Sequence, residues 1–240
     1  MNNKRPSISV IIPVLNEEKH IAQVLNHVSK NNGTDQIIEI LVVDGGSTDN
    51  TIPIAQEYGA TVLASPRGRA QQMNHGAKIA KGDVLYFLHG DTIPPKNFDT
   101  ALLKAYEAGN YAGCFQLRFS GRSRFLNFFA WFTKYNFLIC RGGDQSLFIS
   151  KKLFEQIGGF HEAYTIYEDV EIMERIYKVS EFAILAPKIY TSPRRYLKRG
   201  MIALQWHFAV IHCKHFLGAG PKELYRYYEH HIGPGHSSPS

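Results

Sequence analysis

A short polar cluster follows an apolar run in the first half of the chain. The run spans residues 84–88, and His89, Gly90 and Asp91 come directly after it. A short apolar run bounded by turn residues is typical of a buried strand, and open α/β sheets bind ligands beyond the carboxyl ends of their strands. A carboxylate there suits a divalent cation carrying a phosphorylated ligand, because hard cations prefer oxygen atoms. The cluster is equally compatible with a plain turn in which Asp91 caps the next helix.

Three more polar groups stand at comparable places along the chain. Each follows an apolar strand pattern or begins a helical one, so each can reach the same edge of a sheet. At a helix start, two carboxylates also simply favour the helix dipole, by about 0.3–1 kcal/mol each. The groups are Asn16 and Glu17 after a strand predicted over 7–14, Asp44 after a strand predicted over 37–43, and Glu168 with Asp169 at the start of a helix.

The first half of the chain alternates strand and helix patterns with short links. Further strands are predicted over 61–64 and 84–88. This alternation implies parallel strand pairing with right-handed crossovers, as in a Rossmann-like architecture. Asn16 is a good candidate for the N-cap of the first helix, whose apolar face would carry Ile21, Val24 and Leu25. The first half has neither a G-x-G-x-x-G fingerprint nor a P-loop pattern, which argues against those two phosphate cradles.

The second half has a different composition. Helices are predicted over 94–108 and 151–157, strands over 111–119, 147–149 and 182–190, and a basic connection over 192–200. Residues 123–140 are dense in aromatic side chains, which favours a packed core helix or a dimer face. A helix lying on a membrane surface, flanked by Arg122, Arg124 and Lys134, is the rival interpretation.

Residues 201–217 are mostly apolar on all sides. At about 1.5 Å per residue a helix of this length reaches roughly 25 Å, which is short of a bilayer core. We therefore expect a buried, dimer-forming or surface-lying helix and no membrane span. His207, His212 and His215 lie in or near this segment, but their spacing does not place all three on one helix face. The spacing therefore disfavours a metal site built from them.

The length allows one α/β domain or two small ones, and the composition is sufficient for a real core. The chain has 240 residues, of which 44% are hydrophobic, and only three cysteines without paired spacing. Sparse cysteines are typical of a reducing compartment, and residues 1–6 do not resemble a signal peptide, so we expect a cytoplasmic protein. The domain is predicted over 1–235: a ligand-binding half at about 7–92, a catalytic half at 93–199 and C-terminal helices at 200–232. Residues 233–240 are predicted to be a flexible tail.

Positive charge is concentrated towards the C-terminus. The chain carries a formal charge of +6, and residues 181–240 hold eight Lys and Arg against three Glu. Such a patch can serve a phosphorylated ligand, an acidic membrane surface or nucleic acid, and it can also be a plain solvated face.

The order of these motifs resembles the family 2 glycosyltransferases, which have the GT-A fold. The resemblance covers about residues 7–196. Residues 9–18 are similar to the family's opening strand and residues 42–51 to its second motif. His89-Gly90-Asp91 falls at the metal-binding Asp-x-Asp position, and Gly159-Phe160 followed by Glu168-Asp169 resembles the catalytic stretch. The resemblance therefore implies an α/β fold of GT-A type: a Rossmann-like, mostly parallel central sheet flanked by helices, with helices at the C-terminus.

Two stretches support a narrower resemblance. Residues 66–74 followed by residues 87–92 are similar to a small bacterial branch of the family. That branch is described as a radical-SAM-associated transferase or an arsenosugar-biosynthesis glycosyltransferase.

The resemblance also implies roles for individual residues. Asp169 should be the general base with Glu168 supporting it, and Asp91 should bind Mn²⁺ or Mg²⁺ bridging a diphosphate. His89 stands where the family has its first Asp; a hydrogen bond to phosphate or water is favoured for it over metal ligation. The nucleotide-binding residues implied are Pro13, Leu15, Glu17, Asp44, Arg69, Gly90 and Arg195.

Together these features predict an inverting, metal-assisted glycosyltransferase that moves a sugar from a nucleotide-diphosphate sugar to an acceptor hydroxyl. Family habit favours a UDP-sugar, and the acceptor is not specified. His89 favours one alternative, a catalytically degenerate nucleotide-sugar-binding protein of the same fold. A nucleotidyltransferase would need a Gly-rich basic signature where Asn16 and Glu17 stand. We expect no nucleic-acid partner, and either peripheral contact with the inner membrane face or a homodimer through the helices at 123–140 and 201–217.

Overall fold

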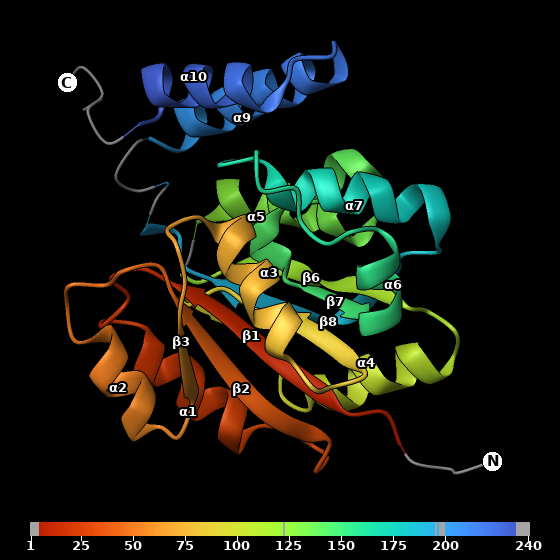
Figure 1. Ribbon diagram of the computed structural model, residues 1–240. Helices are drawn as coiled ribbons and strands as arrows, with labels where there is room; N and C mark the ends of the chain where they lie inside the picture. The colour runs from red at the N-terminus through yellow and green to blue at the C-terminus, as the bar shows by residue number, and fades with distance from the viewer. Residues whose placement is uncertain (1–4, 122, 195, 197–199, 234–240) are drawn as a thin grey trace.

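A central β-sheet with helices on both faces organises the molecule, and two C-terminal helices lie together at one end (Figure 1). The computed structural model describes residues 5–121, 123–194, 196 and 200–233. Among these residues the sheet runs in the order β3-β2-β1-β4-β7-β6-β8-β5.

The first half of the chain forms the parallel part of this sheet, as predicted. β1 pairs in parallel with both β2 and β4, and β2 pairs in parallel with β3. Short helices make the crossovers, so the carboxyl ends of these strands meet at one edge. The elements are β1 (Ile8–Val14), α1 (Ile21–Lys30), β2 (Ile37–Asp44), α2 (Thr51–Glu57), β3 (Thr61–Ala64), α3 (Arg69–Ile79) and β4 (Val84–Phe87).

The second half extends the sheet with mixed pairing. β7 is antiparallel to β4 and to β6, β6 is parallel to β8, and β5 closes the edge antiparallel to β8. The predicted central sheet flanked by helices is confirmed, with a parallel first half and mixed pairing in the second half. The strands are β5 (Thr92–Ile93), β6 (Ala112–Phe119), β7 (Leu147–Ser150) and β8 (Ala183–Thr191). The helices of this part are α4 (Phe98–Glu107), α5 (Arg124–Trp131), η1 (Phe132–Lys134), η2 (Leu138–Cys140), η3 (Gly143–Gln145), α6 (Lys151–Gln156) and α7 (Glu168–Val179).

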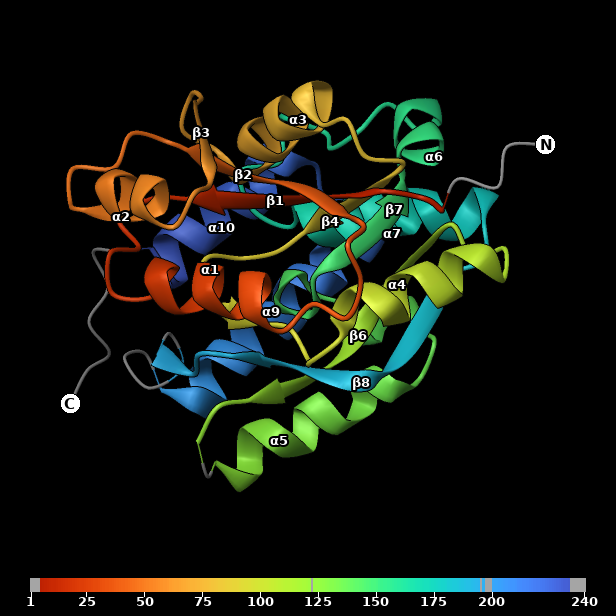
Figure 2. The ribbon, with the colours of Figure 1, turned by 90° about the horizontal axis from the view of Figure 1, so that it is seen from below.

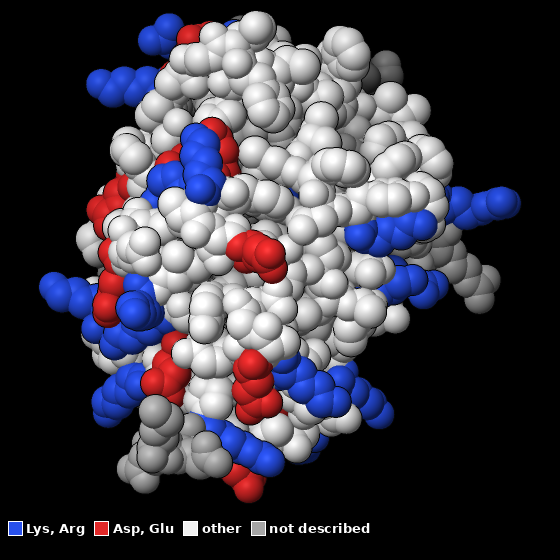
Figure 3. Space-filling view, turned by 90° about the vertical axis from the view of Figure 1, so that its right-hand side faces the viewer, with Lys and Arg blue, Asp and Glu red and all other residues white. Residues whose placement is uncertain are grey.

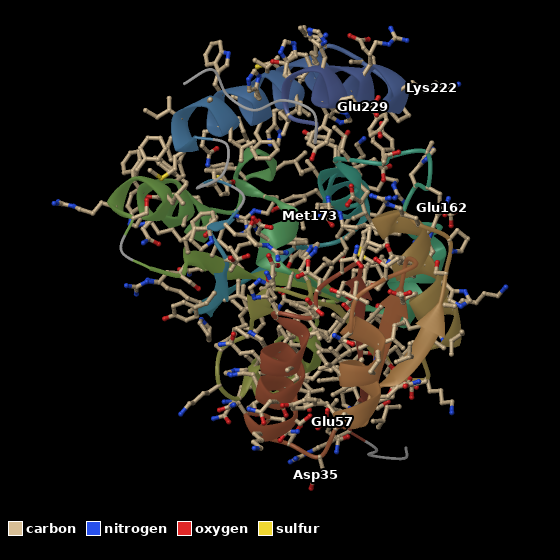
Figure 4. All side chains as sticks on the ribbon, turned by 90° about the vertical axis from the view of Figure 1, so that its left-hand side faces the viewer. Asp35, Glu57, Glu162, Met173, Lys222 and Glu229 are labelled. Atoms are coloured by element: carbon tan, nitrogen blue, oxygen red, sulfur yellow. The ribbon has the colours of Figure 1, made fainter. Side chains whose placement is uncertain are left out.

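The alternation of β1 side chains divides the core into two layers. Ile8, Val10 and Ile12 pack with α1, α2 and α4 on one face, whereas Ile11 packs with α3, α6 and α7 on the other. Figure 2 shows α1 and α3 on opposite sides of β1. Met173 of α7 is 1% exposed and points into the interior (Figure 4). Helices cover both faces of the parallel strands, and the sequences of these strands are therefore continuous apolar runs.

A third apolar cluster joins α5 to the C-terminal helices α9 (Met201–Phe216) and α10 (Pro221–His231). Leu204 and Ile211 are the buried residues of α9, while Ile202 and Trp206 are 73% and 67% exposed. The helix is therefore surface-lying, and the buried alternative for residues 201–217 is wrong. Lys222 and Glu229 of α10, both labelled in Figure 4, are exposed. Within the described residues, no helix has the length and apolar character needed to cross a membrane.

The aromatic segment at 123–140 is also less buried than predicted. Leu126 and Ala130 are the buried residues of α5, whereas Phe128 and Trp131 are 58% and 50% exposed. After Trp131 the chain continues as the short 3₁₀ helices η1 and η2. The interpretation as a packed core helix is therefore wrong, because one narrow stripe meets the core and most of the aromatic rings are exposed.

Candidate active site

A large cleft of about 900 Å³ lies beyond the carboxyl ends of β1 and β4. The chain segments after β1, β4 and β8 and the start of α3 form its walls. The structure brings seven of the sequence-predicted residues to this cleft: Pro13, Leu15, Glu17, Arg69, His89, Gly90 and Asp91. Arg195 lies outside the described residues.

Hydrogen bonds join the loop after β1, which borders the cleft, to the loop after β2. Asn16 has a positive φ of 56°, and its side-chain oxygen accepts a hydrogen bond from the Thr48 amide at 2.8 Å. The Asn16 amide donates in turn to the hydroxyl of Ser47. The first helix begins only at Ile21, without a side-chain cap. The prediction of Asn16 as its N-cap is wrong, because this side chain joins the loops after β1 and β2 instead.

Asp44 lies behind the cleft wall at the end of β2. Its buried carboxylate accepts hydrogen bonds from the amides of Gly46 and Ser47 at 2.9–3.1 Å. The side-chain Nε2 of Gln72 donates to the backbone carbonyls of Val14 and Val43, which fixes the ends of β1 and β2 beside α3. Asp44 therefore shapes the turn around the cleft, and it does not belong to the residues that line the cleft.

An arginine stands between two carboxylates inside the cleft. Arg194 Nη2 lies 2.6 Å from Oε1 of Glu17 and 3.2 Å from Oδ2 of Asp91. Burial lowers the pKa of Arg194, but the two carboxylates outweigh this and raise it overall. The other oxygen of Glu17, Oε2, is buried without a hydrogen-bond partner. A Cβ at Gly90 would come within 3.3 Å of the Glu17 side chain, so glycine keeps this space open.

A second arginine joins the cleft to the start of α7. Arg69 Nε lies 2.6 Å from Oε1 of Glu168, and its Nη1 lies 3.8 Å from Oδ2 of Asp169. The Glu168 side chain is fully buried and that of Asp169 is 13% exposed. Burial lowers the pKa of Arg69, and the charges of Glu168 and Asp169 raise it by more, so the guanidinium stays charged. Of the two acids, Asp169 is the one that can meet a ligand.

Asp169 lines a second cavity, of about 460 Å³, between α5, α7 and α9. This cavity shares four lining residues with the large cleft, so the two spaces meet. The shared residues are Arg69, Asp144, Tyr196 and Phe208. The site is thus a polar cleft and a smaller cavity, with Arg69 at their junction.

The three histidines of α9 have separate partners. His212 Nδ1 lies 2.6 Å from the hydroxyl of Tyr167, and His215 Nε2 lies 2.9 Å from Glu174. His207 pairs instead with Tyr227. Burial lowers the pKa of His212, as does its electrostatic interaction with His215. No group of three metal-ligating side chains occurs among the described residues, so these contacts do not support a histidine metal site.

Several residues that line the cleft were not predicted from the sequence. They are Arg67, Gln72, Asp144, Arg194 and Tyr225. For Arg194 a signal exists, since the basic connection predicted over 192–200 contains it. Which arginine of this connection turns into the cleft depends on the path of the chain after β8.

Residues 9–161 match the family model described as Glycosyl transferase family 2. The match covers more than half of the chain, and the protein therefore belongs to this family. Glycosyltransferase AglE of Haloferax volcanii is 35% identical over 101 residues, which are 39% of this chain and 33% of AglE. The probable glycosyltransferase YdaM of Bacillus subtilis is 26% identical over 199 residues, which are 72% of this chain and 47% of YdaM. The chain thus matches between a third and a half of the length of these relatives.

Solved structures share the fold. The mannosyltransferase PcManGT from Pyrobaculum calidifontis, solved with GDP-Man and Mn²⁺, superposes with a TM-score of 0.68 at 19% identity. The match covers 97% of this chain and 72% of PcManGT. S. aureus TarS 1–349 in complex with UDP-GlcNAc gives a TM-score of 0.63 at 20% identity, covering 78% of this chain and 58% of that chain. At these identities the likeness establishes the fold alone.

Proposed function

We propose that this protein is a glycosyltransferase that moves a sugar from a nucleotide-diphosphate sugar to an acceptor hydroxyl with inversion. The observation that carries the proposal is the placement of Asp169. Its carboxylate lines the smaller cavity, while Arg69 beside it lines the large cleft. Donor and acceptor can therefore approach the same point from two sides, which is the positioning that sugar transfer needs.

The large cleft is the proposed donor site. Pro13 and Leu15 would contact the nucleoside, and Asp44 would hold the turn on which the base rests. Arg69 and Arg194 line the cleft and would meet the diphosphate of the donor. We propose a UDP-sugar as the donor, since TarS, a family relative of similar fold, is solved with UDP-GlcNAc.

The residues of the cleft fit a divalent cation. The guanidinium of Arg194 already sits between the carboxylates of Glu17 and Asp91, and Oε2 of Glu17 is a buried oxygen with no hydrogen-bond partner. Mg²⁺ sites usually take one or two carboxylates and complete the coordination with phosphate oxygens and waters. Asp91, with Glu17 beside it, would hold the ion, and His89 would contact phosphate or water. When bound, the ion would neutralise charge on the leaving diphosphate.

Asp169 is the proposed general base. In the transfer step the acceptor O–H gives its proton to the Asp169 carboxylate, and the acceptor oxygen forms a bond to the anomeric carbon. The bond from that carbon to the diphosphate oxygen breaks, and its electron pair leaves with the nucleoside diphosphate. Attack opposite the leaving group inverts the anomeric centre. A positioned base contributes about 10²–10⁴-fold to such a rate. Glu168 would hold Arg69 in place, since its own carboxylate is buried.

Within the family, we propose membership of the radical-SAM-associated branch. The two stretches that resemble this branch contain residues that line the cleft. These residues are Arg67, Arg69 and Gln72 in the stretch 66–74, and His89 and Asp91 in the stretch 87–92. Both of the stretches that carry the branch resemblance therefore border the donor cleft.

Nucleotide binding tests this proposal directly. Melting temperatures would be measured with UDP, GDP, UDP-glucose and GDP-mannose, each with and without Mn²⁺. A ligand that binds the native state raises the melting temperature. At a ligand concentration of 100 times its Kd, the folded state gains about 2.7 kcal/mol of stability. We expect a metal-dependent rise with uridine nucleotides. No rise with any nucleotide would refute the donor site.

His89 favours one alternative, a degenerate protein that binds a nucleotide sugar without transferring it. Turnover separates the two functions. Release of UDP from a UDP-sugar, dependent on Asp169, supports the transferase. Metal-dependent binding with no UDP release from any sugar donor or acceptor would support the binding protein.

A further inference from the structure

We infer that the smaller cavity binds the apolar body of the acceptor, an amphiphile with a hydroxyl at the end that meets Asp169. This inference rests on the proposed function and names the acceptor class for it. The cavity meets the donor cleft at Arg69 and has Asp169 in its wall, so an acceptor approaching the base from this side must fill the cavity.

The wall of this cavity is mostly apolar. Its side chains come from β6, from the segment α5 to η2, from α7 and from α9. Burying apolar ligand surface against such a wall contributes roughly 25 cal/mol per Å². The volume of about 460 Å³ lies in the range of small-molecule sites, which is about 300–1,000 Å³. The apolar lining includes Leu117, Phe119, Phe132, Ile139, Val170 and Ile211.

Two polar side chains in the wall, those of Thr133 and Arg141, are already engaged with the protein. The Thr133 hydroxyl donates to the Ala130 carbonyl and accepts from the Leu117 amide. The buried Arg141 donates from Nη2 to the carbonyls of Thr133 and Tyr135. A sugar-like acceptor would bury many hydroxyls here without compensating hydrogen bonds, which is costly.

Two further polar groups of the wall are occupied in the same way. The Tyr167 hydroxyl is bonded to His212 at 2.6 Å, and the side-chain oxygen of Gln145 accepts from the Gly142 amide. Nη1 of Arg141 also contacts the sulfur of Cys114, so this guanidinium is directed at protein atoms rather than at the cavity. Arg69, Asp144 and Asp169 therefore form the charged end of the cavity. Gln205 adds one polar side chain, and the remaining lining is mostly apolar, which favours an apolar ligand.

The cavity opens to the surface through the aromatic segment. Phe132 and Ile139 line the cavity and are also 38% and 65% exposed, so they form its mouth. Apolar surface continues outside the mouth on the same segment, where Phe128 and Phe137 are 58% and 64% exposed. Figure 3 shows a broad area without Lys, Arg, Asp or Glu on one side of the molecule. An amphiphile can thus reach the cavity over apolar side chains of this segment.

The test uses 2-naphthol, a hydroxyl on an apolar ring system, and glucose as the hydrophilic hydroxyl compound. Binding of each to the full chain is measured by calorimetry. Ile139→Asp places a charge in the mouth, and Phe137→Asp is the matched control, because its residue is equally exposed but outside the cavity lining. We expect 2-naphthol to bind, Ile139→Asp to weaken it by at least about fivefold, and Phe137→Asp to change it by less than about twofold.

Three outcomes would overturn the inference: no binding of 2-naphthol, equal binding of glucose, or equal effects of the two variants. Equal effects, with equal loss of binding to phosphatidylglycerol vesicles, would show that the aromatic segment is a membrane-contacting surface instead. UDP binding with Mn²⁺ is measured in the same samples. If UDP binds and 2-naphthol does not, only the acceptor class is refuted. If UDP fails to bind while 2-naphthol binds at the cavity, the proposed function fails instead.

Discussion

The guanidinium of Arg69 lies 2.6 Å from the carboxylate of Glu168, although one residue begins α3 and the other begins α7. This ion pair joins the two halves of the chain at the point where the donor cleft meets the smaller cavity. Glu168 is fully buried, so its charge needs a nearby cation to be tolerated. The pair therefore stabilises the fold and also holds the neighbouring Asp169 in place.

Replacing Arg69 should destabilise the protein through Glu168. We expect Arg69→Met to lower the free energy of unfolding by about 1–3 kcal/mol, because it removes the cation beside a buried carboxylate. Adding Glu168→Gln should recover most of this loss. The exposed pair Lys178–Glu174 is the control for the cycle, with an expected coupling of about 0.3–0.5 kcal/mol. Urea denaturation measures all four variants of each cycle, and equal coupling in the two pairs would refute the assigned role.

Removing the Asp169 charge should stop transfer and leave donor binding intact. We expect Asp169→Asn to lower the rate of sugar transfer by about 10²–10⁴-fold. The UDP affinity should change by less than about twofold, since Asp169 is absent from the lining of the large cleft. Asp35→Asn, at an exposed position far from the cleft (Figure 4), is the control. Turnover retained in Asp169→Asn would disprove the assignment of the base.

Arg194 should affect metal and nucleotide binding in opposite directions. In Arg194→Ala, Glu17 and Asp91 lose the guanidinium between them, so the affinity for Mn²⁺ alone should rise by about threefold or more. The affinity for UDP in saturating Mn²⁺ should fall by a similar factor, because a cation near the diphosphate is lost. Calorimetry measures both constants. Arg118→Ala, on the exposed side of β6, should change neither. Changes of the same sign in both affinities would contradict this arrangement.

Stability should fall on mild acidification, in part through His212. Burial lowers the pKa of His212, so as the pH falls the unfolded chain binds this proton before the folded protein does. That contribution to stability is complete above the ordinary histidine pKa and is lost as the pH falls below it. We expect the urea midpoint to drop between pH 7.5 and 5.5, and to drop less in His212→Gln. His212→Gln should still lose some stability on acidification. His27, whose pKa is also lowered by burial, accounts for part of this remaining loss.

Gly76 should be irreplaceable on packing grounds, although it lies within a helix. A Cβ at this position would come within 2.6 Å of the Ile11 side chain and 3.0 Å of Val43. Gly76→Ala should therefore destabilise the protein by about 1–3 kcal/mol, despite the gain in helix propensity. Lys78→Ala, on the exposed side of α3, should change stability by less than about 0.5 kcal/mol. A Gly76→Ala protein as stable as the parent would show that α3 can move away from β1.

Much of the fold follows from local patterns in the sequence. Continuous apolar runs predict β1, β2 and β4, because strands covered on both faces need apolar residues at every position. A helix lies between each strand and the next in this half of the chain, and such helical crossovers join parallel strands, whose carboxyl ends then meet at one edge. The polar cluster at His89 to Asp91 can therefore be placed at a binding edge from the order of the residues alone.

Contacts between distant parts of the chain explain the features that local patterns did not predict. Asn16 has the chemistry of a helix cap, yet it bonds to Thr48 on the neighbouring loop, and a contact across 32 positions leaves no local pattern. The apolar helix at Met201–Phe216 is exposed because only one narrow stripe of it meets α5 and α10. Burial is a property of the partner surface, which periodicity within one segment cannot specify.

The sequence by itself determined which residues are able to do chemistry, because side-chain type and position at a strand end are local facts. Only the tertiary structure decided which of them act together. Arg69 meets Glu168, and Arg194 meets Glu17 and Asp91, through chain paths that join distant segments. The smaller cavity is likewise a product of packing between α5, α7 and α9, since a space between elements has no signature within any one of them.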